Sequence, residues 1–184
     1  MILWRFRVKS PSAQGFAIID LLFVCAIIGI VSGIALPKLV MARSSAFSAS
    51  AIATMRTLNS AQLTFAITCG NGFYAPNLTS LAKPPAGSVD GYIKGDLGSA
   101  DTVIKSGYTI QMSGTPFAGA PDTCNQLGVG TTALAFKAGA DPVDNNTGTR
   151  FFAVNANGSI WEDTTSLFAA MPEDLDPAVG QTIH

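Results

Sequence analysis

The feature that most constrains this chain is one apolar run, from Phe16 to Leu36, whose only charged side chain is Asp20. The run begins directly after Gly15 and ends directly before Pro37. As a helix it would be about 31 Å long at about 1.5 Å per residue, which matches a hydrocarbon core of about 30 Å. A carboxylate at that depth costs about 2.5–3.5 kcal/mol, so Asp20 is a candidate functional residue. The run predicts a transmembrane helix with an acid near its start.

The distribution of charge predicts the orientation of that helix. Arg5, Arg7 and Lys9 precede the run, whereas eight basic and eleven acidic residues follow from Pro37 onward. Because a positive flank stays cytoplasmic, the C-terminal part is expected outside the membrane. With 184 residues in total, that part has room for one globular domain. Its mildly acidic balance argues against general nucleic-acid binding, although a local basic patch is compatible with it.

The three cysteines agree with an exported domain. Cys25 lies inside the apolar run, where a cysteine behaves as a small hydrophobic residue. Cys69 and Cys124 fall in the outer domain, where an oxidising compartment permits a disulfide. Such a bridge would close a loop of about 55 residues and stabilise the fold by roughly 4 kcal/mol. The sequence favours the bridge, with two free thiols as the alternative.

Beyond the apolar run, the periodicity of apolar residues predicts one long helix followed by strands. From Lys38 to about Thr68 the sequence predicts an amphipathic helix. This helix should end near Cys69, before Gly70, Asn71 and Gly72. Its buried stripe recurs at spacings of three and four: Phe47, Ala51, Met55, Leu58, Gln62 and Phe65. Small residues dominate between Ala42 and Thr54, which suits close helix packing; the alternative is a solvated helix that is simply rich in alanine.

Four later segments are predicted strands, two because apolar and polar residues alternate in them and two because they flank a turn signal. Tyr108–Met112 and Thr131–Lys137 are the first two. Phe151–Asn155 and Ser159–Asp163 flank an Asn-Gly pair at positions 157 and 158, which is a strong signal for a hairpin.

Residues Gly15 to Leu39, GFAIIDLLFVCAIIGIVSGIALPKL, resemble the N-terminal signature of type IV prepilins and type II secretion pseudopilins. That family has a short basic leader, then G-F-x-x-x-E, an apolar stretch and a proline. The resemblance implies that a prepilin peptidase cuts after Gly15 and methylates the new amino terminus at Phe16. It also implies a helical filament with the apolar helices bundled in its core. The family acid is nearly always Glu, and Asp20 is one methylene shorter, so major and minor subunit roles both stay open.

The resemblance extends more loosely over the rest of the chain. GFYAPNLTSLA, from Gly72 to Ala82, resembles the segment after the long helix in major pseudopilins, and Ala140 to Trp161 resembles their terminal hairpin. The implied fold is α+β: the pilin fold, a long N-terminal membrane-spanning helix packed on a small antiparallel sheet. The expected parts are a leader over 1–15, the transmembrane half of the helix over 16–36, its amphipathic half over 37–69, and a globular loop and sheet region over 70–184.

Two residues of the helix are implied to act in assembly. A buried carboxylate at Asp20 would pair with the free amine of Phe16 on a neighbouring subunit and set the axial register; the alternative is an acid that only reaches headgroup water. Pro37 cannot donate a helix hydrogen bond and is expected to kink or locally open the helix. Gly29 and Gly33 are spaced G-x-x-x-G, which permits close helix approach in a membrane, with tolerated glycines as the alternative.

No residue pattern for catalysis was found, so we expect no enzyme. The only histidine is the last residue, His184, and no nucleophile, zinc or phosphate-loop motif occurs. We expect no cofactor; Ca²⁺ is the alternative, since some major pseudopilins hold it through carboxylates and carbonyls in a C-terminal loop. Glu173, Asp174 and Asp176, and also Asp141 and Asp144, are the acids available, and a solvated acidic surface is the preferred interpretation.

The sequence therefore favours a structural subunit of a type IV pilus or of a type II secretion pseudopilus. The resemblance implies a homopolymer as the main partner, together with the prepilin peptidase, an inner-membrane assembly platform, an assembly ATPase and minor pilins or pseudopilins. Nucleic acid would be a partner only if the filament serves DNA uptake. The expected location is the inner membrane before assembly and a periplasmic or cell-surface filament afterwards. The alternative is a membrane-anchored extracytoplasmic binding module that does not polymerise, and a secreted enzyme with an uncleaved anchor is the weakest hypothesis.

Overall fold

The computed structural model describes residues 18–183, and the chain divides into two units between Met41 and Ala42. The dividing point lies inside one long helix, α1, which runs from Ile18 to Thr68. The described residues of the first unit form the apolar part of α1. The second contains the rest of α1, a six-stranded sheet and the loops around them. The architecture is α+β, with a long apolar N-terminal helix and an antiparallel sheet.

The helical pattern read from the sequence is confirmed in the second unit. Met55, Leu58 and Phe65 are fully buried, as is Gln62 on the same stripe. The helix ends at Thr68, where the amide of Gly70 donates to the carbonyl of Phe65 and the amide of Gly72 to that of Ala66. Gly72 has a φ of 91°, which a residue with a side chain rarely adopts, so this glycine suits the turn that ends the helix.

Two short helical segments follow α1. They are α2, Leu78–Ala82, and the 3₁₀ turn η1, Gly95–Gly98. Asn77 caps α2, since its side-chain oxygen accepts a hydrogen bond from the amide of Ser80 at 2.9 Å. Leu78 and Leu81 then point into the core.

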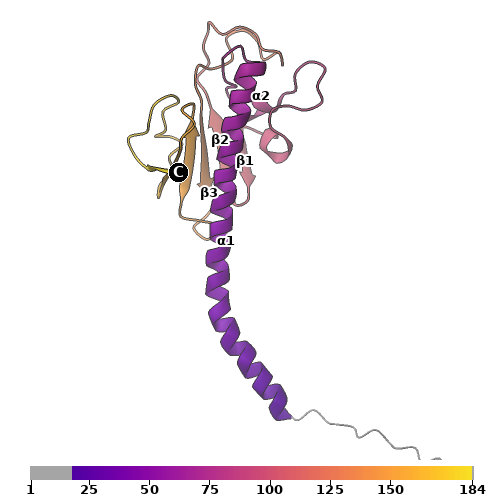
Figure 1. The fold of residues 1–184 in the computed structure, drawn as a ribbon, viewed down its shortest axis with the longest axis vertical. Helices are drawn as coiled ribbons and strands as arrows, with labels where there is room; N and C mark the ends of the chain where they lie inside the picture. The colour runs from indigo at the N-terminus through magenta and orange to yellow at the C-terminus, as the bar shows by residue number, and fades with distance from the viewer. Residues whose placement is uncertain (1–17, 184) are drawn as a thin grey trace, which may run out of the picture. The chain divides into compact units, whose positions relative to one another are not determined.

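The sheet is a simple meander in which each strand pairs antiparallel with the next along the chain. Figure 1 shows the C-terminal part of α1 running beside these strands. Their bounds are β1 Thr102–Lys105, β2 Tyr108–Ser113, β3 Lys137–Pro142, β4 Phe151–Asn155, β5 Ile160–Asp163 and β6 Gln181–Ile183. The predicted hairpin between β4 and β5 is present, with Val154 opposite Ile160.

One predicted strand is wrong. Thr131–Lys137 was expected to be extended and paired, but the strand β3 only begins at Lys137. In the segment before it, Ala133 forms isolated bridges to Tyr74 on one side and Pro116 on the other. Thr132, Ala133, Ala135 and Phe136 are all buried in this segment, so its burial does not alternate as it would in a half-buried strand.

The sheet has a covering layer on each face. Tyr108, Ile110 and Phe152 point toward α1 and form the main core with it. On the opposite face, Ala153 packs with Leu167 and Met171 from the segment between β5 and β6. Gly139 belongs to that second face, where an added Cβ would lie 2.9 Å from the Cβ of Phe168. The order of layers in the second unit is therefore α1, sheet, and the 164–180 segment.

Candidate functional site

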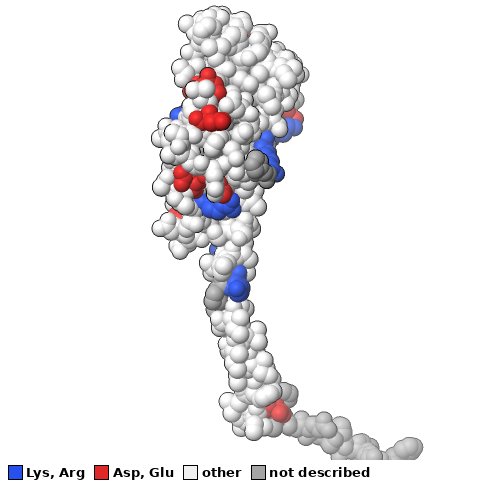
Figure 2. Space-filling view, turned by 60° about the vertical axis from the view of Figure 1, so that its left-hand side comes forward, with Lys and Arg blue, Asp and Glu red and all other residues white. Residues whose placement is uncertain are grey.

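The first candidate site is the apolar part of α1, which is exposed over its whole described length in the first unit. Every described side chain from Ile18 to Met41 is exposed, and Ile18 has an exposed fraction of 79%. Figure 2 shows that charged side chains are almost absent from this segment. The helix is long and apolar enough to span a membrane. An apolar surface of this size requires lipid or another protein around it.

Asp20 lies in the first turn of α1, with its side chain exposed. A carboxylate there is favoured by the positive end of the helix dipole. Within residues 18–183, no basic side chain lies at ion-pair distance from it. Gly15 and Phe16, the predicted cleavage and methylation sites, lie outside the described residues, as does His184. Cleavage and methylation therefore stay predictions.

The middle of the apolar segment contains two glycines that face open space. A Cβ added at Gly29 or Gly33 would meet no atom within 4 Å, so both positions leave notches open to a neighbouring helix. Cys25 is a free cysteine on the same exposed segment. The structure gives α1 as one helix from Ile18 to Thr68, and the expectation that Pro37 kinks or locally opens the helix stays a prediction.

The second candidate site is the outward face of α1 in the second unit. Most exposed residues of this face are small, namely Ala42, Ser45, Ala46, Ala49, Ala53, Thr57, Ser60 and Thr64. Arg56, Leu63 and Ile67 are the exceptions, and all three are exposed. The hydroxyls of Thr57 and Thr64 donate to the backbone carbonyls of Ala53 and Ser60, which reduces their need for water. A smooth face of this kind allows another helix or domain to approach closely.

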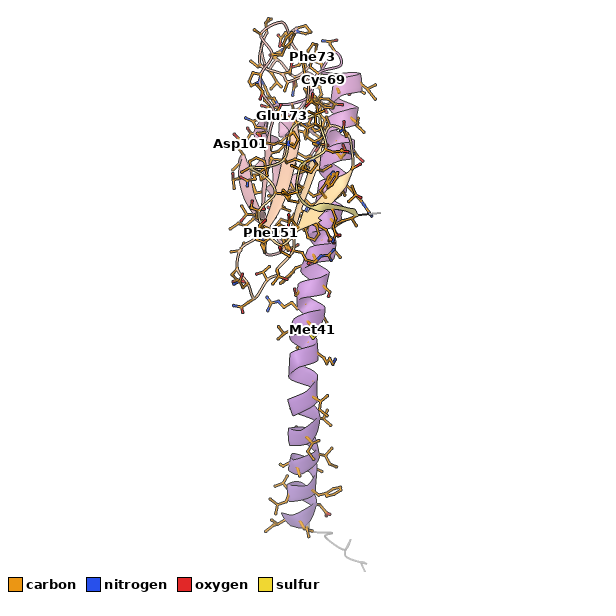
Figure 3. All side chains as sticks on the ribbon, turned by 90° about the vertical axis from the view of Figure 1, so that its left-hand side faces the viewer. Met41, Cys69, Phe73, Asp101, Phe151 and Glu173 are labelled. Carbon is orange, nitrogen blue, oxygen red and sulfur yellow. A yellow bond between two sulfur atoms is a disulfide. The ribbon has the colours of Figure 1, made fainter. Side chains whose placement is uncertain are left out.

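The disulfide expected from the sequence is present in the structure. Cys69 and Cys124 are bonded, with their Cα atoms 4.8 Å apart. The bridge ties the end of α1 to the long connection between β2 and β3, and the amide of Cys124 also donates to the carbonyl of Cys69. Figure 3 shows Cys69 and Phe73 together near this end of α1. The helix end is thereby fixed to the loops that follow the sheet's second strand.

Three of the five acidic residues considered for calcium accept hydrogen bonds from Thr or Ser residues, and the other two, Asp174 and Asp176, are exposed. Glu173 accepts from the amide and the hydroxyl of Thr115, at 3.1 and 2.9 Å. Asp141 accepts from the hydroxyl of Ser166 at 2.6 Å. The hydroxyl and amide of Thr147 donate to Asp144 and hold the pKa of that carboxyl below its usual value. Among the described residues, no three His, Cys, Asp or Glu side chains are grouped so that they would hold a metal.

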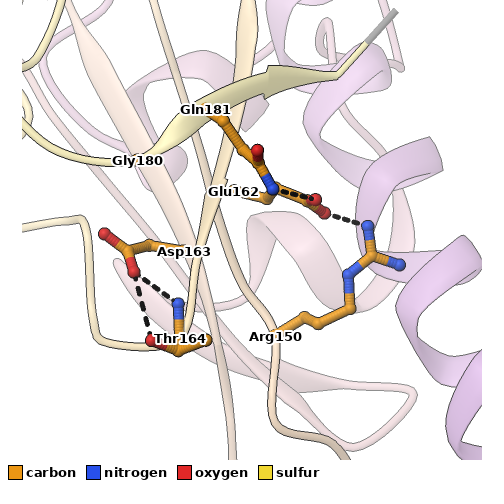
Figure 4. Close-up of a pocket in the computed structure, with 6 residues that line it drawn as sticks. All are labelled: Arg150, Glu162, Asp163, Thr164, Gly180 and Gln181. Carbon is orange, nitrogen blue, oxygen red and sulfur yellow. Dashed lines mark hydrogen bonds and ion pairs between the residues drawn. The ribbon is translucent and has the colours of Figure 1, made fainter.

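A shallow pocket of about 270 Å³ lies where β5 and β6 meet (Figure 4). Arg150 forms an ion pair with Glu162, and Gln181 donates to the other oxygen of Glu162 at 3.1 Å. Asp163 accepts from the amide of Thr164 at 2.5 Å. These polar groups bind one another, so the arrangement links the last strand to the sheet. No pattern in the sequence indicates this network, because β6 is too short and polar to be recognised as a strand.

Comparison with known proteins found no protein family that this chain matches, no similar curated protein and no similar solved structure.

Proposed function

We propose that this chain is a structural subunit of a type IV pilus or of a type II secretion pseudopilus. The observation that carries the proposal is the apolar surface of α1 between Ile18 and Met41, whose described side chains are all exposed in the first unit. A single anchoring helix would need this apolarity too. The sequence GFAIID at Gly15–Asp20 and the open positions at Gly29 and Gly33 favour a helix that also packs against copies of itself.

The energetics explain why such a helix would leave the membrane only by assembly. Each buried Val, Leu, Ile or Phe side chain is worth about 1.5–3 kcal/mol relative to water. Extraction of α1 into water would expose many such side chains together, including Leu21, Leu22, Phe23 and Ile27. Neighbouring apolar helices in a filament core offer an equivalent environment. The notches at Gly29 and Gly33 permit the required close packing.

Asp20 would then fix the axial position of each subunit relative to its neighbour. A charged carboxylate in an apolar core is expensive unless it is paired. After cleavage behind Gly15, the new amine of Phe16 on one subunit would face Asp20 of its neighbour, and the pair would neutralise two charges at once. Its position in the first turn of α1 places it close in sequence to that amine. We propose the inner membrane as the site of the unassembled subunit, with the second unit outside.

Mass spectrometry of the mature chain, combined with sedimentation of sheared cell-surface or periplasmic material, tests this function. The proposal expects a chain that begins at methylated Phe16 and sediments as a polymer. A chain that begins at Met1 and remains monomeric in detergent would contradict it and would favour a membrane-anchored binding module. The length of the filaments in electron micrographs then separates the pilus from the shorter pseudopilus.

A further inference from the structure

One groove on the outward face of α1 combines a cation with apolar surface. Its volume is about 430 Å³, and it is lined by Arg56, Thr57, Ser60, Ala61, Thr64 and Tyr92. Tyr92 is held in place, because its ring packs edge-on against Phe65 and its hydroxyl lies 3.0 Å from that of Thr68. Leu63 and Ile67 are exposed on the same helix face, and Ile67 has an exposed fraction of 82%. Within residues 18–183, Arg56 has no ion-pair partner.

A segment on the other side of the second unit has the complementary chemistry. Leu175 is 66% exposed and stands between two exposed carboxylates, Asp174 and Asp176. We call residues 174–176 the acidic tip. An exposed leucine flanked by two acids fits a groove that offers an arginine and apolar side chains.

The backbone around the acidic tip is held firmly. The side-chain amide of the buried Asn155 donates to the carbonyls of Pro172 and Leu175, at 3.1 and 2.6 Å. The amide of Ala156 donates to the carbonyl of Glu173, and Met171 is fully packed against the sheet. A fixed backbone presents Leu175 without a large loss of conformational freedom on binding.

The two surfaces cannot meet within one copy. The groove opens on the side of α1 that faces away from the sheet, whereas Asn155 holds the acidic tip on the sheet face opposite α1. Contact is therefore available only between copies, and it joins two different patches. A contact of that kind is heterologous, and repetition of it produces an open helical filament unless the rotation closes into a ring.

We propose that the acidic tip of one copy docks in the Arg56 groove of the next copy, with Leu175 against Leu63 or Ile67 and with Asp174 or Asp176 paired to Arg56. This inference rests on the proposed function, since it assumes that the chain polymerises. From Ala42 onward the chain has seven basic and eleven acidic residues, so a neighbour's surface offers excess acid to a solitary arginine. Arginine suits the site, because its planar guanidinium binds a carboxylate through two parallel hydrogen bonds.

Charge exchange in the full chain, in cells that assemble the wild type, tests the contact. Arg56→Glu alone, and Asp174→Lys with Asp176→Lys, should each lower the polymerised fraction by about tenfold or more. The combination of all three should restore most of it. Lys105→Glu, which reverses an exposed cation on β1, is the matched control and should assemble normally.

Cross-linking locates the contact directly. In a Cys25→Ser background, chains that carry both Ser60→Cys and Leu175→Cys should give a ladder of disulfide-linked oligomers on mild oxidation. Ser60→Cys combined with Val129→Cys, another exposed position, should not. Normal assembly of Arg56→Glu together with absence of the ladder would overturn the docking and leave the proposed function intact. A wild-type chain that stays monomeric with its leader in place would overturn both.

Discussion

The side-chain amide of Gln62 pairs in both directions with the backbone of Ala75. Its Nε2 donates to the carbonyl of Ala75 at 2.8 Å, and the amide of Ala75 donates to its Oε1 at 2.9 Å. Both residues are completely buried. Gln62 thus acts as a one-residue strand partner for the segment that leaves α1, and it satisfies two backbone groups that water cannot reach.

Gln62→Leu should destabilise the second unit by about 2–4 kcal/mol, because two buried backbone groups lose their partners while the side-chain volume changes little. The free energy of unfolding of the full chain in detergent, measured in urea by near-UV circular dichroism, checks this. Leu63→Ala, at the neighbouring exposed position, should change it far less. Equal effects of the two substitutions would contradict the structural role of the Gln62–Ala75 pair.

Reduction of the Cys69–Cys124 bridge should cost roughly 4 kcal/mol of unfolding free energy, since the closed loop restricts the unfolded chain. Cys69→Ser combined with Cys124→Ser should unfold at the same lower urea concentration with or without reductant. Cys25→Ser is the matched control, because Cys25 is free, and it should respond to reductant as the wild type does. A wild-type midpoint that does not move on reduction would contradict this account.

Asp144 should titrate below the ordinary aspartate value of 3.8, chiefly because the hydroxyl and amide of Thr147 stabilise its charged form. The pKa in the folded chain is lowered, so this contribution to stability is present above 3.8 and is lost as the pH falls through the folded pKa. Thr147→Val should raise the pKa, whereas Ser166→Ala, which affects a different acid, should not. A carbon-detected NMR titration of the carboxyl groups follows the change.

Gly139→Ala should destabilise the sheet by about 1–3 kcal/mol, because the new methyl group overlaps the side chain of Phe168 on the face away from α1. Phe168→Gly removes all three side-chain atoms that lie near that position, at 2.9, 3.0 and 3.3 Å. The double variant should therefore be more stable than the sum of the two single effects, in thermal unfolding of the full chain. Strict additivity would show that the 164–180 segment does not pack on the sheet as described.

The parts of the fold that the sequence predicted are those with local causes. The stripe of Met55, Leu58 and Phe65 has helical spacing, and Asn157-Gly158 determines its own turn. The alternation of residue types around Ala133 was misleading, because this segment forms only isolated bridges to Tyr74 and Pro116 and its burial does not alternate. The hydrogen bonds of Gln62 and Asn155 could not be predicted, because their partners are backbone atoms of segments distant in the sequence. No spacing of residues indicates such a contact.

The candidate functional residues also differ in whether the sequence alone indicates them. Asp20 can be recognised as a candidate from the sequence alone, since a single acid within an apolar run is unusual both in a membrane and in a protein core. Arg56 and Leu175 are ordinary residues in the sequence. They become notable only once the layer order places them on opposite sides of the sheet with complementary surroundings.

Asp20→Ala should leave leader cleavage largely intact and reduce filament yield, because a subunit that lacks the carboxylate has no partner for the neighbouring amine in an apolar core. Asp20→Glu keeps the charge and adds reach, so it should assemble at least as well as the wild type. The mature N-terminus by mass spectrometry and the sedimented fraction of sheared material separate processing from assembly. Urea unfolding of the second unit should be unchanged in both variants, since Asp20 lies in the other unit. Full filament yield from Asp20→Ala would refute the pairing while leaving the membrane-spanning role of the helix untouched.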